Sequence, residues 1–232
     1  MKCAFPLGVL FGLLMPGLSH AETDNLLWTS SGITYQPAKR WKLQGTQNFR
    51  FMENASRLES LMPQAEFEYS PYKWLDVGGG YRFIYESKKD DEMVSAHRYN
   101  ADIQFAHKLG NFKLSYRLRY QEKHKSENLD IIMRLRNRFK LSYDTQTPYS
   151  PLLAMESFTG EDLNTRKTRL TMGVAAKLSK AHRLKVRYHH QTLIDVDERE
   201  TERIFLLDYM YRIPKKKKKN KKEIGSEPDK PD

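Results

Sequence analysis

Cysteine is almost absent from this chain of 232 residues, in which the only example is Cys3. It stands before the first apolar run and lacks the small-residue context of a lipoprotein cleavage site. We therefore expect it to be removed with an amino-terminal signal peptide. The rest of the chain can then form neither disulfides nor thiolate metal sites.

Long hydrophobic runs are missing as well. The one apolar run, residues 4–18, is broken by two prolines and is shorter than the ~20 apolar residues that a membrane-spanning helix needs. It follows Lys2 and ends at Ser19-His20-Ala21, a small-x-small cleavage pattern. The sequence predicts a signal peptide over residues 1–21, cleaved after Ala21, and argues against a helical membrane protein.

Core-forming side chains are also scarce, because 39% of the residues are hydrophobic and 30% are charged. That is little for a globular core in a chain of this length. A transmembrane β-barrel avoids the shortage, since only its outer face must be apolar and its lumen can be polar. The aromatic fraction of 12% suits the interface belts of such a wall.

The pattern that is present is an alternation of apolar and polar residues with a period of two. In residues 112–121 the even positions are apolar or aromatic and the odd positions are polar or basic, without exception. A helix would scatter both sets around its circumference. Segments of this kind predict strands at 26–36, 41–51, 61–69, 75–85, 98–108, 112–121, 129–143, 149–158, 166–178, 182–191 and 202–213.

Short and long connections alternate between these segments, as in outer-membrane barrels. Eleven segments are counted, whereas single-chain bacterial barrels have even numbers. We therefore predict an all-β, antiparallel up-and-down barrel of about twelve strands (10–12) over residues 22–213. The difference of one is assigned to a further short strand near 22–31 or to irregularity in 149–158. Three glycines at 78–80 predict a bulge or tight bend.

Four groups of residues carry a family resemblance. They are Trp41-x-Leu43 through Phe49-Arg50, Val77-Gly78-x-Gly80-Tyr81-Arg82, Arg136-Asn137-Arg138, and the strand from Pro148 to Glu156. With them the chain resembles, from about Leu26 to Ile213, the bacterial outer-membrane family known as domain of unknown function 2490. The resemblance implies a barrel in the outer membrane of a Gram-negative bacterium. It brings no established activity and no catalytic residues.

The polar face of the predicted strands is strongly basic. Its cations are Arg82, Arg98, Lys113, Arg117, Arg119, Arg134, Arg136, Arg138, Lys140, Lys167, Arg169, Lys185 and Arg187. Its acids are Glu66, Glu68, Asp76, Asp102, Glu156 and Asp208. A water-filled lumen with such a lining would favour anions. A narrow lumen filled by Arg–carboxylate pairs would instead be closed.

Three functions follow, in falling order of preference. The first is a structural or interaction component of the cell envelope with a lumen largely filled by side chains. The second is a narrow, porin-like, anion-preferring channel, and the third is a barrel lipid hydrolase. A hydrolase needs a serine beside a histidine, but Ser95 near His97, and His189-His190 before two aspartates, match no recognised motif. We expect no enzyme activity and no catalytic residues.

Other ligands have little support in the sequence. No metal-binding motif and no glycine-rich phosphate loop occur, so neither a metal site nor a cofactor is predicted. Asp90-Asp91-Glu92 is interpreted as a solvated loop tip. The net charge of +11 is explained by the lumen and the tail, without a nucleic acid.

The carboxy-terminal residues 214–232 contain seven lysines between Lys215 and Lys222. Such a segment is predicted to be a disordered tail, and contact with anionic lipid is the alternative. The partners expected for the whole protein are outer-membrane lipids, lipopolysaccharide and the barrel-assembly machinery during insertion.

Overall fold

The computed structural model describes residues 25–87, 92–127, 130–194 and 200–214. The predicted signal peptide, residues 1–21, lies outside these ranges. So does the predicted lysine-rich tail, apart from Pro214. Within the described residues no helix is long and apolar enough to cross a membrane.

The described residues form eleven β-strands. They are β1 (Asn25–Ala38), β2 (Trp41–Met52), β3 (Arg57–Tyr72), β4 (Leu75–Ser87), β5 (Met93–Leu109), β6 (Phe112–Lys125), β7 (Ile131–Tyr143), β8 (Tyr149–Thr159), β9 (Thr165–Lys177), β10 (His182–Leu193) and β11 (Thr201–Arg212). Each strand begins within a few residues of its predicted start, because the period-two pattern marks the half-buried segments directly.

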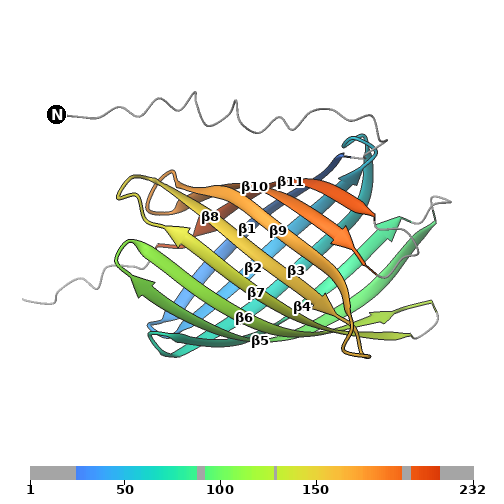
Figure 1. The fold of residues 1–232 in the computed structure, drawn as a ribbon, viewed down its shortest axis with the longest axis horizontal. Helices are drawn as coiled ribbons and strands as arrows, with labels where there is room; N and C mark the ends of the chain where they lie inside the picture. The colour runs from blue at the N-terminus through green and yellow to red at the C-terminus, as the bar shows by residue number, and fades with distance from the viewer. Residues whose placement is uncertain (1–24, 88–91, 128–129, 195–199, 215–232) are drawn as a thin grey trace, which may run out of the picture.

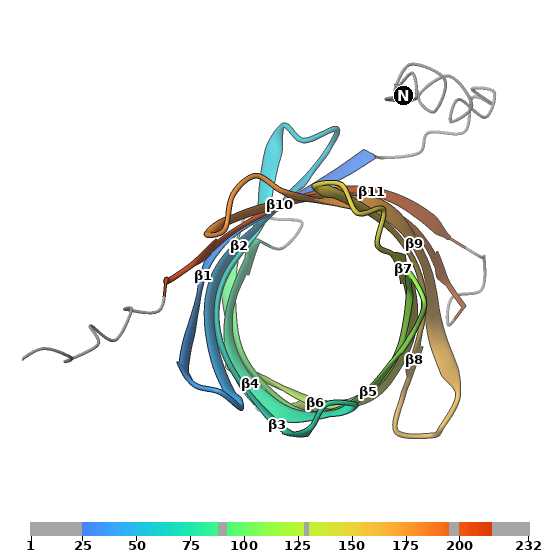
Figure 2. The same cartoon turned by 90° about the vertical axis from the view of Figure 1, so that its left-hand side faces the viewer.

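The strands close into one barrel in sequence order (Figures 1 and 2). Ten neighbouring pairs are antiparallel hairpin partners. The closing pair, β1 with β11, is parallel and runs from Asn25 opposite Arg203 to Thr34 opposite Arg212. An all-β barrel of 10–12 strands is thus confirmed.

The strand count shows where the sequence-based prediction needs correction. In the described residues the count is eleven, and an odd number forces the first and last strands to run in the same direction. The arrangement is therefore not antiparallel throughout. The segment suspected of irregularity is strand β8, which pairs with β7 from Leu152 to Thr159 and with β9 from Tyr149 to Thr159, with a register shift between Phe158 and Thr159. Residues 25–38 form the single strand β1.

The two rims of the barrel differ in their connections. The connections after β1, β3, β5, β7 and β9 lie at one rim, hereafter the short-turn rim, where the chain also leaves β11. Three of these five connections span two residues. One of them contains Gly110, whose φ of 57° is readily adopted only by glycine. The opposite rim, hereafter the loop rim, carries the connections after β2, β4, β6, β8 and β10 and the start of β1.

Side chains alternate between the outer and the inner face of the barrel wall. On β11, Phe205 and Leu207 expose 50% and 43% of their surface, whereas Ile204 and Leu206 expose 0% and 7%. Large hydrophobic side chains on the outward positions of every strand are exposed in the same way. The outer face of the barrel is therefore apolar.

Five apolar side chains are buried on the inner face of the loop-rim half, where charged side chains such as Lys123 and Glu86 also lie. The five are Met62, Ile84, Ala96, Phe158 and Ile204, hereafter the inner apolar cluster, with exposed fractions between 0% and 7%. They come from β3, β4, β5, β8 and β11, and Met62, Ile84 and Ala96 pack together on three neighbouring strands. The sequence analysis, which assigned a polar face to each strand, did not predict these inward apolar residues.

The three glycines of β4 do not form a bulge. Pairing between β4 and β5 continues without interruption from Leu75 to Ser87. On the other side of β4, the register shift with β3 lies between Tyr69 and Tyr72, away from the glycines. A Cβ atom at Gly78 would collide with the carbonyl oxygen of Phe67. The glycines therefore allow close approach of the two backbones rather than a bend.

Gly173 on β9 occupies a similarly crowded position. A Cβ atom there would collide with the carbonyl oxygen of Val186 on β10. We expect Gly173→Ala to lower the free energy of unfolding by about 1–3 kcal/mol, because the backbone must move to relieve the overlap. Gly45→Ala is the matched control, since nothing lies within 4 Å of a Cβ at that position. Urea titration in detergent micelles measures both, and equal effects would contradict the prediction.

Candidate functional site: the basic interior

Like charges face one another across neighbouring strands inside the barrel. Arg117 and Arg119 on β6 stand directly opposite Arg138 and Arg136 on β7. Like charges in this relation destabilise a sheet. Carboxylates from other strands, neighbouring and more distant, offset part of this repulsion.

Glu156 on β8 is the centre of the first network. Its carboxylate lies 2.9 Å from a guanidinium nitrogen of Arg136, 3.4 Å from one of Arg117 and 3.6 Å from one of Arg169. The exposed fraction of the Glu156 side chain is 6%. Arginines from three other strands thus share one buried acid. Arg117 on β6 reaches it past the intervening strand β7.

Arg119 is the centre of the second network. It forms a bidentate ion pair with Asp102 on the neighbouring strand β5, the arrangement in which guanidinium and carboxylate bind most strongly. It also contacts Glu66 on β3 at 2.9 Å. Because β4 and β5 lie between β3 and β6, this last contact crosses the interior of the barrel.

The remaining predicted acids have local partners. Asp208 accepts hydrogen bonds from Arg187 and from Ser30, the latter at 2.7 Å. Glu68 pairs with Lys42 at 2.6 Å. Asp76 accepts hydrogen bonds from Ser70 and Gln104.

Several predicted cations have no carboxylate partner. Arg82 donates to the side-chain oxygen of Gln64. Among the residues that the structure describes, Arg98, Arg134, Arg138 and Lys140 form no ion pair. Arg138 and Lys140 lie beside a cavity.

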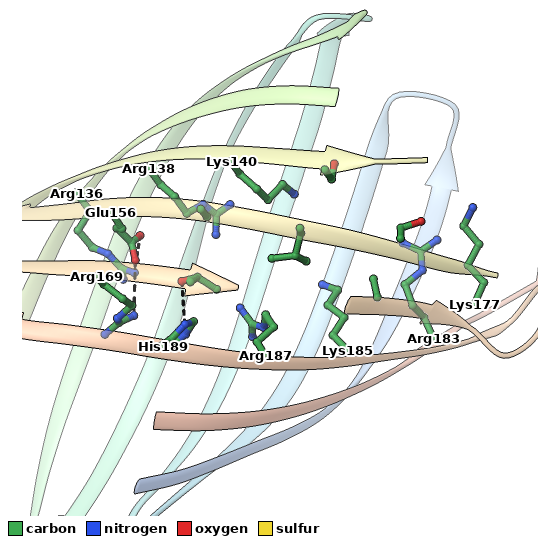
Figure 3. A pocket seen from close by; sticks show the side chains of 16 residues that line it. Arg136, Arg138, Lys140, Glu156, Arg169, Lys177, Arg183, Lys185, Arg187 and His189 are labelled. Carbon is green, nitrogen blue, oxygen red and sulfur yellow. Dashed lines mark hydrogen bonds and ion pairs between the residues drawn. The ribbon is translucent and has the colours of Figure 1, made fainter. Parts of the chain in front are cut away.

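A cavity of about 350 Å³ lies against the inner faces of β7, β8, β9 and β10. Eight basic side chains line it, with Glu156 as the one acid: Arg136, Arg138, Lys140, Arg169, Lys177, Arg183, Lys185 and Arg187. Figure 3 shows Arg138 and Lys140 of β7 and Lys185 and Arg187 of β10 directed toward the space between these two strands. This basic cavity extends from the Glu156 network to the short-turn rim, where Arg183 on β10 stands opposite Lys177 on β9.

Aromatic side chains inside the barrel were missed by sequence reasoning, which expected aromatics on the outer wall. Arg50 lies over the Trp28 ring at 3.9 Å, and Arg136 lies over the Phe158 ring at 4.5 Å. Arg169 contacts both rings. The alternation of inward and outward positions along β1 and β8 was the signal that could have placed Trp28 and Phe158 inside. These cation–π contacts stabilise cations that have too few carboxylate partners.

The two histidines of β10 that were considered for hydrolysis lie on opposite faces of the barrel wall. His189 is buried inside the barrel with its Nδ1 atom 2.8 Å from the hydroxyl of Thr171, whereas His190, one position along β10, is exposed. Ser95 donates to Ser126. Adjacent strand residues face opposite sides of the wall, so His189 and His190 cannot share one site. The aspartates at 195 and 197 lie outside the described residues.

A group of three or more His, Cys, Asp or Glu side chains that could hold a metal ion does not occur in the part of the chain that the structure describes. Among known proteins, the model of a family described as protein of unknown function (DUF2490) matches residues 25–201. No curated protein matches the chain.

The Glu156 network yields a prediction about stability. In Glu156→Gln, three buried guanidinium groups lose their shared negative charge, so we expect the free energy of unfolding to fall by about 3–5 kcal/mol. Glu68→Gln is the matched control, because the Lys42–Glu68 pair is more than 30% exposed, and such pairs contribute about 0–1 kcal/mol. Urea titration in micelles measures both variants. A Glu156→Gln protein as stable as the control would refute the assigned role.

Proposed function

The chain belongs to the DUF2490 family of proteins of unknown function, and from this premise we propose that it is a non-enzymatic outer-membrane barrel with a structural or interaction role in the envelope of a Gram-negative bacterium. In this proposal the barrel wall spans the membrane and the loop-rim half of the interior is closed. Membrane lipids and lipopolysaccharide surround the barrel, and the barrel-assembly machinery inserts it.

The apolar outer face supports insertion into a membrane. A wall with exposed Phe, Leu, Ile and Tyr side chains on all strands would be an aggregation hazard in water, whereas lipid removes that cost. A closed barrel also satisfies its backbone hydrogen bonds without an edge, as a membrane requires. The predicted signal peptide supports export to the envelope.

The observation that carries the proposed closed interior is the inner apolar cluster. Its five side chains are almost inaccessible to water, and the buried polar residues Gln121 and Gln191 expose only 7% and 1% in the same half of the barrel. A channel needs a continuous column of water there. The Glu156 and Arg119 networks brace the wall at the next level toward the short-turn rim.

A narrow anion-preferring channel is the second candidate. The basic cavity favours it, because an excess of arginine and lysine attracts anions. It requires the inner apolar cluster to move aside. Electrical recording distinguishes the two candidates.

Planar-bilayer recording of the purified protein is expected to show no discrete conductance steps. The triple variant Met62→Ala, Ile84→Ala, Ile204→Ala should introduce steps, because shortening three inward side chains removes the obstruction. The matched control is the outward triple variant Ile103→Ala, Leu114→Ala, Leu141→Ala, which should stay silent. Anion-selective steps from the unmodified protein would overturn the closed interior and establish the channel.

The position of the two rims can be tested because the chain lacks cysteine beyond Cys3. Leu163→Cys lies between β8 and β9 at the loop rim, and Lys180→Cys lies between β9 and β10 at the short-turn rim. Long connections face outward in outer-membrane barrels. An impermeant maleimide should therefore label Leu163→Cys on intact cells, and Lys180→Cys only after the outer membrane is permeabilised. The reverse pattern, or no labelling of either in membranes, would refute the proposed topology.

A lipid hydrolase is disfavoured because His189 lies inside the barrel, away from the lipid-facing wall. Its hydroxyl partner is a threonine that is also buried. No role for a nucleic acid is proposed, since the basic residues near the cavity are directed inward (Figure 3).

A further inference from the structure

We propose that the basic cavity is a binding site for a small soluble anion that carries two or more phosphate groups and enters from the short-turn rim. This inference goes beyond the envelope role and does not depend on whether the barrel conducts. It rests on the unbalanced charge in the cavity, on the shape of the cavity and on where the cavity ends.

The cavity holds cations that have no ion-pair partner among the described residues. Arg138, Lys140 and Lys185 are each partly buried and form no ion pair within the described ranges. The Nε atom of Arg138 is buried and has no hydrogen-bond partner there. Burying an ionised group without a partner is costly. An anion in the cavity would supply the missing charge and the missing acceptor.

The arrangement of these cations favours more than one anionic group. Arg138 and Lys140 on β7 and Lys185 and Arg187 on β10 point toward a common space (Figure 3). Guanidinium groups bind phosphate through two parallel hydrogen bonds, whereas lysine acts as a mobile point charge. Phosphates at two places in the space could meet Arg138 with Lys140 on one side and Lys185 on the other, while Arg187 stays paired with Asp208. A cavity of about 350 Å³ is at the lower end of the range for small-molecule sites.

The inner end of the cavity explains entry from one side. Its deepest lining residues are Arg136, Glu156 and Arg169, which already neutralise one another in part. Phe158 lies beyond them, 4.5 Å from the Arg136 guanidinium. The guanidinium groups at this end already share the Glu156 carboxylate, so they offer an anion fewer free donors than Arg138 and Lys140 do. An anion would therefore remain near the unpaired cations, reached past Lys177 and Arg183 at the short-turn rim.

Isothermal titration of the full chain in non-ionic detergent tests the site with tripolyphosphate as the probe, at about 0.15 M salt, where long-range attraction is screened. We expect saturable binding of one probe per chain. The double variant Lys140→Gln, Lys185→Gln should bind about tenfold more weakly or not at all, because two charge-assisted contacts are lost.

Lys167→Gln is the matched control. Lys167 is an inward lysine on β9 that lies 5.8 Å from the Phe158 ring and does not line the cavity. The control should keep the affinity of the unmodified protein. An equal loss in both variants, or no saturable binding by the unmodified protein, would overturn the proposal. Equally tight binding of inorganic phosphate would overturn the requirement for several phosphate groups.

Thermal unfolding gives a second readout on the unmodified protein. Tripolyphosphate should raise its unfolding temperature, because a ligand that binds only the folded state stabilises it. The rise should be absent in the Lys140→Gln, Lys185→Gln variant. If only micelles containing phosphatidic acid give a rise that depends on these two lysines, the source is a lipid headgroup and the soluble-anion proposal fails.

Discussion

The rest of the structure depends on the ion pairs between the many inward arginines and the few inward carboxylates. Two carboxylates, Glu156 and Asp102, together contact four guanidinium groups. Because charges inside a protein are poorly screened, Glu156 and Glu66 also act on arginines of strands that are not their neighbours. The wall is thus braced through its interior as well as along its hydrogen-bond ladders. Cations beyond the reach of these acids gather beside the cavity or lie over aromatic rings.

The interior differs along its length. Toward the loop rim, buried apolar side chains lie beside paired charges such as Lys123 with Glu86. Toward the short-turn rim, cations are concentrated where acids are missing. The networks of Glu156 and Arg119 lie between these two regions, and the Glu156 network borders the basic cavity.

Much of the fold could be predicted from the sequence, because alternation with a period of two reports directly which residues face each side of a strand. It placed the strands, and it identified the polar face with its arginines. It could not show that Glu66 reaches Arg119 past two strands, since distances through the interior depend on barrel closure. The inward positions of Met62, Ile84 and Ile204 were missed because an apolar residue on the polar face only interrupts the pattern. The pattern does not show which side chains from other strands lie beside it. Whether the number of strands is odd or even likewise depends on which strands pair where the barrel closes. No local sequence signal reports that pairing.

The parallel pairing of β1 with β11 has a consequence for the path of the chain. The first residue of β1 lies at the loop rim and the last residue of β11 at the short-turn rim. In an even-numbered barrel both ends of the sheet emerge on one side, so either end can be extended without entering the other compartment. Here, extensions of the two ends would leave the barrel at opposite rims. In the membrane topology proposed above, a pair of fused reporters, one at each end, would thus read the two sides of the membrane from one polypeptide.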